Sequence, residues 1–209
     1  MHPNRLHEIF SIDSSTAGYY KNYSKYLNEL MSSLNYDAIA EVSKCFLGAR
    51  EKGATIFFAG NGGSAATASH FAQDLAEVGR KANVKSFKTL SLTDNVSFIT
   101  AVGNDYGYEK VFSVQMAELF NKGDVFVAIS ASGNSPNVIE AVKYANEKGG
   151  TTIGLVGFDG GKLSELCNHI IHAVSNKGEY GPVEDIHMIL VHMITSYLML
   201  KLSNGNKKI

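Results

Sequence analysis

The stretch TIFFAGNGGSAATASHFAQDL, residues 55–75, runs from apolar residues through a glycine turn into a segment with helical spacing. Its first part, TIFFA (55–59), combines β-branched and aromatic side chains, which predicts a buried strand. The glycines of GNGGS (60–64) permit a tight turn, and residues 64–79 are typical of a helix. A strand, a glycine turn and a helix in this order form the first half of a βαβ unit.

The same alternation continues along the chain. Four more apolar strands are predicted, at 87–92, 125–130, 151–156 and 169–174. Helices are predicted at 107–121, 136–148 and 162–167, and a long terminal helix at 183–202. Strands that are apolar along their whole length and separated by helices are typical of a parallel sheet covered on both faces. We therefore expect an α/β fold, a doubly wound five-stranded parallel sheet.

The segment before the first strand has a different pattern. Apolar residues recur three or four positions apart in residues 14–33 and 36–52, which predicts two amphipathic helices. A chain of 209 residues suffices for one domain with a full core. We expect residues 1–209 to form a single domain in which residues 1–52 pack on the core or on a neighbouring subunit.

Composition excludes several classes of protein. The formal net charge of -1 provides no overall field that would attract nucleic acid or an anionic membrane. Apolar runs are shorter than the roughly 18 residues of a membrane-spanning helix, and the N-terminus lacks a signal-peptide pattern. Cys45 and Cys167 have no partner at zinc-ribbon spacing, so we expect free thiols in a reducing compartment. These features predict a cytoplasmic protein that binds neither nucleic acid nor a membrane.

Two loops at strand ends are candidates for phosphate binding. GNGGS (60–64) and SASGNSPN (130–137) each follow a strand and precede a helix, and ligands of such folds bind at the carboxyl ends of strands. Backbone N–H groups and hydroxyls at a helix start can bind phosphate without lysine or arginine. The first loop lacks both nucleotide-binding spacings, so no nucleotide is implied. Either loop alone also suits a simple helix cap, whereas two on one sheet favour a site for an anionic small molecule.

Two helical segments carry candidate acid–base or metal-binding groups. His70 and Asp74 are four residues apart and share one helical face. They can act as acid and base, as metal ligands, or only as a surface pair. Glu184, His187 and His192 lie among apolar residues of the terminal helix, as ligands or as satisfied polar residues. Glu184 and His192 are about 12 Å apart along a straight helix, so one ion joins them only if both side chains lean toward it.

Five segments then occur in a characteristic order. They are GNGGSAATASHFAQDL (60–75), VGNDYG (102–107), GDVFVAISASGNSPNVIEA (123–141), GFDGGKL (157–163) and EDIHMILVH (184–192). In this order they resemble the SIS-domain (sugar isomerase) family, and most of all its phosphoheptose isomerase branch. The resemblance covers roughly residues 30–200 and implies a flavodoxin-like or Rossmann-like SIS fold with two N-terminal helices and a long C-terminal helix. It also implies an isomerase that interconverts sedoheptulose 7-phosphate and D-glycero-D-manno-heptose 7-phosphate through an enediol, for lipopolysaccharide or capsule synthesis.

The resemblance also assigns roles to matching positions. It implies one zinc ion per subunit, held by His70, Asp74, Glu184 and His192, with Asp74 and His192 as the catalytic acid–base pair. The implied substrate-binding residues are Asn61, Gly62, Gly63, Asp74, Asn104, Asp105, Ser130, Ala131, Ser132, Ser135 and Glu184. It further implies a homotetramer with its active sites at subunit interfaces.

Some positions depart from the family pattern. Asp74 stands where relatives carry glutamate, Glu184 where they carry glutamine, and Ala131 where threonine is common. Gly181 and Pro182 replace an acidic and a basic residue. These departures leave open the substrate and its stereochemistry, so an isomerase of another phosphosugar is one alternative.

The other alternative is a non-catalytic SIS module that senses a sugar phosphate or binds a replication initiator. The initiator-binding branch loses the histidine that is His192 here, so its presence argues for the enzyme.

Overall fold

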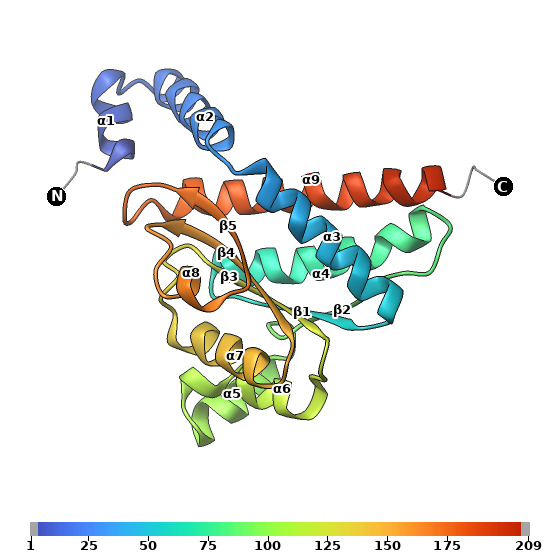
Figure 1. Ribbon diagram of the computed structural model, residues 1–209. Coiled ribbons are helices and arrows are strands. Elements are labelled where there is room, and N and C mark those ends of the chain that lie inside the picture. Colours follow the sequence, from blue (N-terminus) through green and yellow to red (C-terminus); the bar gives the residue numbers. More distant parts are fainter. Residues whose placement is uncertain (1–3, 206–209) are drawn as a thin grey trace.

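The computed structural model describes residues 4–205, and its centre is a five-stranded sheet (Figure 1). The strands are β1 (Thr55–Ala59), β2 (Lys88–Ser91), β3 (Val125–Ser130), β4 (Thr151–Phe158) and β5 (His169–Val174). All neighbouring strands pair in parallel, in the order β2-β1-β3-β4-β5. The predicted fold class and all five predicted strands are confirmed.

Helices cover both faces of this sheet (Figure 1). Alternate residues of β1 point to opposite faces, so that Ile56 and Phe58 enter one core and Phe57 and Ala59 enter the other. The first core contains α3 (Tyr36–Lys52), α4 (Gly63–Lys81) and α9 (Tyr180–Gly205). The second contains α5 (Val96–Asp105), α6 (Ser113–Leu119), α7 (Pro136–Glu147) and α8 (Leu163–Leu166). This double covering explains why the strands are apolar along their length.

The helix predicted at 107–121 is replaced by shorter elements. A 3₁₀ turn, η1 (Tyr108–Lys110), follows Gly107, whose φ of +96° ends regular helical geometry. Helix α5 lies just before it, where no helix was predicted. Its β-branched residues, such as Val96 and Ile99, are weak helix formers, and the side chain of Asn95 supplies the cap by accepting from the Phe98 N–H at 3.0 Å.

Helix α9 is long because one side of it packs inside the protein. Among residues 4–205 it is the one helix with the length and composition to cross a membrane. Its residues Leu190, Ile194 and Leu198 are instead buried in the core formed with α4 and the sheet. Packing therefore accounts for the apolar residues on the buried side of α9.

The N-terminal segment contains one helix more than predicted. The predicted pair corresponds to α2 (Thr16–Ser32) and α3, and a short additional helix, α1 (Arg5–Ile12), precedes them. Helices α1 and α2 extend beyond the sheet (Figure 1), and buried Glu179 at the start of α9 ties them to the body. Its carboxylate accepts from the Tyr26 hydroxyl at 2.6 Å and from the backbone N–H of Arg5 at 2.5 Å.

Removing one hydrogen-bond donor to the Glu179 carboxylate tests whether these bonds stabilise the N-terminal helices. We expect Tyr26→Phe to lower the free energy of unfolding by about 1.5–3 kcal/mol, because a buried hydrogen bond to a charged group is lost. Urea denaturation measures the change. Tyr20→Phe, at a 63% exposed position of the same helix, is the matched control. Equal stabilities of the two variants would show that the Glu179 tie contributes nothing.

Candidate active site

The two candidate phosphate-binding loops, residues 60–64 and 130–137, lie next to each other at the carboxyl edge of the sheet. Strands β1 and β3 are neighbours, with Ala59 opposite Ala128, so the loops that follow them start side by side. Between them is a small cavity of about 130 Å³. Its lining residues are Asn61, Ser64, Ile129, Ser130, Ala131, Ser132, Ser135, Tyr180 and Glu184. Five of the residues predicted to bind substrate therefore share one cavity with Glu184.

The loop SASGNSPN (130–137), called the serine loop below, presents hydroxyls to this cavity. Ser135 precedes the first residue of α7, yet its side chain makes no capping bond and lies 3.2 Å from the Ser130 hydroxyl. Gly133 makes the tight turn possible, since its φ is +62° and a Cβ would lie 1.9 Å from the Gly160 carbonyl oxygen. The serine hydroxyls give the loop hydrogen-bond donors without a cationic side chain. At the start of α7, Pro136 has no N–H and the Val138 N–H is bonded to Asn137 Oδ1.

Glu184 supplies a carboxylate to the same cavity. A Cβ placed on Gly63 would lie 2.2 Å from its Oε2 atom, so the carboxylate rests directly on that glycine. Burial raises the pKa of Glu184, and the neighbouring Asp185 carboxylate raises it further. The cavity therefore combines donors from the serine loop with one acidic group, and Gly63 leaves the space that this group occupies.

A second group of side chains lies where α4 packs against α9. His70 and Asp74 come from α4, and His192 comes from α9. The Nε2 atoms of His70 and His192 are 3.1 Å apart, and His70 Nε2 lies 3.3 Å from Asp74 Oδ2. The side chains of His70 and Asp74 are 41% and 22% exposed, so a ligand can reach them.

This group fits a divalent metal ion. One donor atom from each of His70, Asp74 and His192 lies within 4.8 Å of the other two. In a tetrahedral zinc site with bonds of about 2.0–2.1 Å, neighbouring donor atoms lie about 3.3 Å apart, close to the separations seen here. Two imidazoles and a carboxylate with a fourth position open is the donor set of a catalytic zinc site. Glu184, predicted as a fourth ligand, lies outside this group with its carboxylate on Gly63.

Other predicted residues lie elsewhere. Asn104 and Asp105 are exposed at the end of α5, where the Asn104 side chain donates to Asp105 at 2.8 Å, and neither lines the cavity between the loops. His187 is completely buried, and its Nε2 bonds the Val156 carbonyl oxygen of β4 at 3.3 Å. His187 therefore joins α9 to the sheet through Nε2 and is a core residue, while its buried Nδ1 has no hydrogen-bond partner among the described residues.

Two residues that the sequence did not indicate hold Asn61 in place. The side chains of Asn61 and Asn137 exchange a pair of hydrogen bonds of 2.9 and 2.8 Å, and the Tyr108 hydroxyl donates to Asn61 Oδ1 at 3.0 Å. Asn137 is 1% exposed in the first turn of α7. The sequence did offer one signal for Asn137: an amide at a buried position of a helix requires hydrogen-bond partners.

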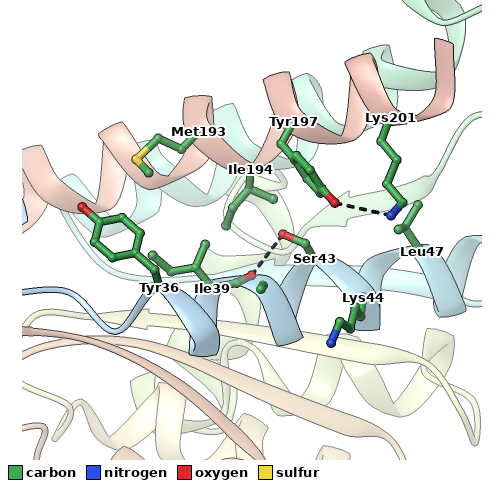
Figure 2. Close-up of a pocket in the computed structure, with 10 residues that line it drawn as sticks. Tyr36, Ile39, Ser43, Lys44, Leu47, Met193, Ile194, Tyr197 and Lys201 are labelled. Carbon is green, nitrogen blue, oxygen red and sulfur yellow. Dashed lines mark hydrogen bonds between the residues drawn. The ribbon is translucent and has the colours of Figure 1, made fainter. Parts of the chain in front are cut away.

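A separate apolar groove lies between α3 and α9, with a volume of about 270 Å³. Figure 2 shows Tyr36 and Ile39 of α3 and Met193 and Tyr197 of α9 along it. None of the predicted site residues lines this groove. It is therefore a surface distinct from the catalytic candidates.

The buried His187 makes stability depend on pH. Burial lowers its pKa from 6.5 to about 4, so between these values the unfolded chain binds a proton that the folded chain does not. Stability contributed by neutral His187 is therefore present above pH 6.5 and is lost as the pH falls toward 4, by about 3 kcal/mol in total. Urea unfolding between pH 4.5 and 7.5 should show a shallower dependence in His187→Gln than in the wild type. The exposed His7→Gln variant should keep the wild-type slope, and equal slopes in all three would contradict the assignment.

Comparison with known proteins places the chain in a family. The family model described as the SIS domain matches residues 18–157. A phosphoheptose isomerase from Aliarcobacter butzleri is 41% identical over 169 residues, which cover 80% of this chain and 87% of that protein. One from Helicobacter hepaticus is 39% identical over 174 residues, covering 82% and 87%. The solved phosphoheptose isomerase from Neisseria gonorrhoeae superimposes with a TM-score of 0.78 at 32% identity, covering 90% of this chain and 98% of that one. With this agreement in sequence and structure, the chain belongs to the SIS domain family, in the branch that contains the phosphoheptose isomerases.

Proposed function

We propose that the protein is an aldose–ketose isomerase that interconverts sedoheptulose 7-phosphate and D-glycero-D-manno-heptose 7-phosphate. The meeting of His70, Asp74 and His192 carries the proposal, since it adds acid–base groups to a fold that has phosphate-type loops. A module that only bound a sugar phosphate would need the loops and not this cluster. Relatives named phosphoheptose isomerase, about 40% identical over four fifths of the chain, support the choice of substrate.

The reaction requires movement of protons between two carbons. A base removes the proton from the carbon beside the carbonyl while the carbonyl oxygen gains a proton, which gives the enediol. A proton then returns to the former carbonyl carbon while the hydroxyl on the other carbon loses its proton and becomes the new carbonyl. We assign these transfers to Asp74 and His192, which come from two helices and approach the same point beside His70. A carboxylate and an imidazole are both groups that act as general acids and bases when a substrate is held against them.

The same cluster is the proposed site of one zinc ion per subunit. His70, Asp74 and His192 would hold it, and the bound ion would polarise the carbonyl and hydroxyl oxygens of the sugar. Glu184 remains a proposed ligand by family resemblance, with its carboxylate resting on Gly63.

The proposed substrate lies between the cluster and the two loops. Ser130, Ser132 and Ser135 would bind the phosphate through hydroxyls and the start of α7, which positions the sugar for reaction. Asn61 would bind the sugar, with the backbone of the turn at Gly62 and Gly63 beside it. Asn104, Asp105 and Ala131 remain proposed substrate-binding residues by resemblance.

The proposed assembly is a cytoplasmic homotetramer with active sites at subunit interfaces, which supplies heptose precursors for lipopolysaccharide or capsule. The apolar groove between α3 and α9 (Figure 2) and the exposed Phe10 and Ile12 of α1 offer surfaces for subunit contacts. Light scattering should give a mass near four times 22.6 kDa. A mass near one chain would refute the assembly.

Replacing the catalytic carboxylate tests the proposed chemistry. Asp74→Asn should lower kcat by about 100-fold or more, the usual contribution of a positioned acid–base group, while leaving the protein folded. NMR of the heptose 7-phosphate product measures turnover and its anomeric form. Glu77→Gln, on the same helix, removes one carboxylate charge at a position paired with Arg80 and serves as the control. Full activity of Asp74→Asn would refute the assignment.

Metal removal provides an independent test. Dialysis against a chelator should abolish turnover of sedoheptulose 7-phosphate, and added zinc should restore it. Elemental analysis of the purified protein should find about one zinc per chain, lost in His192→Ala because one of the proposed ligands is gone. Unchanged turnover of the metal-free protein would show that zinc has no part in the reaction.

A further inference from the structure

The side chain of Asn61 is fixed through a chain of hydrogen bonds that begins at a backbone group. The N–H of Val138 donates to Asn137 Oδ1 at 3.0 Å, which identifies that atom as the oxygen because an N–H cannot accept. The other end of the Asn137 amide is then Nδ2, which donates to Asn61 Oδ1 at 2.8 Å. In return Asn61 Nδ2 donates to Asn137 Oδ1 at 2.9 Å. The backbone of α7 thereby sets the orientation of both amides.

Tyr108 donates the second hydrogen bond to the Asn61 side-chain oxygen. Its hydroxyl lies 3.0 Å from Asn61 Oδ1, and since that atom is an acceptor the hydroxyl must donate. A carbonyl oxygen has two lone-pair directions, and Asn137 and Tyr108 use both. The nitrogen of Asn61 has two hydrogens, of which one goes to Asn137. Asn61 is left with one free N–H donor and no free acceptor.

This donor belongs to a residue that lines the cavity between the two loops. We propose that Asn137 is a positioning residue which, together with Tyr108, makes Asn61 a donor only, directed at an accepting oxygen of the substrate. The inference rests on the proposed function and deepens it. An oxygen of this kind is the carbonyl of an open-chain ketose phosphate or a phosphate oxygen, and a hydroxyl bound here must accept with its oxygen.

The pair also joins the two loops. Asn61 belongs to the turn after β1, and Asn137 follows the serine loop after β3. Because the hydrogen bonds that orient both amides are made before a ligand arrives, no rearrangement of Asn61 is needed on binding, and a preorganised donor costs less to use. A buried amide that lost its partner would instead favour other orientations of Asn61.

The first test replaces one nitrogen by oxygen. Asn137→Asp keeps the size of the side chain and the acceptor for the Val138 N–H. It replaces the Nδ2 donor by an oxygen, which cannot donate to Asn61 Oδ1. We expect kcat/KM for sedoheptulose 7-phosphate to fall by about 10-fold to 100-fold, with KM raised because the donor is misdirected. Asn146→Asp makes the same change at the other end of α7, where the amide bonds Leu166 and Thr152, and should leave kcat/KM within about twofold of wild type.

The second test separates positioning from folding. Tyr108 is 58% exposed, so Tyr108→Phe should fold normally and lower kcat/KM by about threefold to tenfold, whereas Tyr106→Phe, 67% exposed, should change nothing. If Asn137 and Tyr108 act through Asn61, neither substitution should lower kcat/KM further in an Asn61→Ala background. Multiplicative losses in that background would overturn the proposal.

A readout without turnover keeps the inference distinct from the proposed function. In ¹⁵N NMR spectra, the side-chain amide of Asn61, identified by its loss in Asn61→Ala, should show one hydrogen protected from solvent exchange. That protection should disappear in Asn137→Asp and persist in Asn146→Asp. Protection retained in Asn137→Asp would overturn the positioning role. Inactivity of the wild type toward ketose phosphates would refute the isomerase while leaving this result to stand alone.

Discussion

The packing of α4 against α9 is the contact on which the candidate site depends. Each helix buries an apolar stripe on the same face of the sheet, and the two exposed edges of these stripes face one another. His70 and Asp74 lie on one edge and His192 on the other, so their donor atoms meet. Burial of Phe71, Leu75, Leu190 and Ile194 thus fixes the distance between groups that themselves contribute little to the core.

The sheet provides the second constraint. The strand order reverses direction at β1, because β2 follows β1 in sequence and lies on one side of it, while β3 lies on the other side. The gap between β1 and β3 is therefore the topological switch point of the sheet. Loops after β1 and β3 therefore diverge to opposite faces and leave a crevice between them, which is where open α/β sheets bind ligands. The Asn61–Asn137 pair lies at this crevice and joins its two sides. The loop after β1 runs directly into α4, which carries His70 and Asp74, so the sheet edge and the contact between α4 and α9 together place the cluster relative to the loops.

Glu184 brings a carboxylate to the cavity between the two loops. Burial and the neighbouring Asp185 carboxylate raise its pKa. The carboxylate lies on Gly63 and not with the histidines, so this acidic group faces that cavity.

The sequence by itself determined the fold class and the five strands, and it indicated His70, Asp74 and His192, which meet in the candidate site. Strand periodicity and glycine turns are local properties, so TIFFA and VFVAIS could be located without knowing their neighbours. The sequence-based prediction of helices was wrong at α1 and in the region of α5 and α6, where short helices depend on caps and on packing more than on periodicity.

Only the tertiary structure decided which site residues meet. Glu184 and His192 share one helix, yet Glu184 lines the cavity between the loops and lies outside the cluster that contains His192. His70 and His192, 122 residues apart in sequence, come within 3.1 Å. The partners of Asn61 could not be identified from the sequence either, because Asn137 of α7 and Tyr108 of η1 are 76 and 47 residues away from it along the chain. Sequence spacing reports distances along an element, and the contacts between elements are set by how their apolar faces pack.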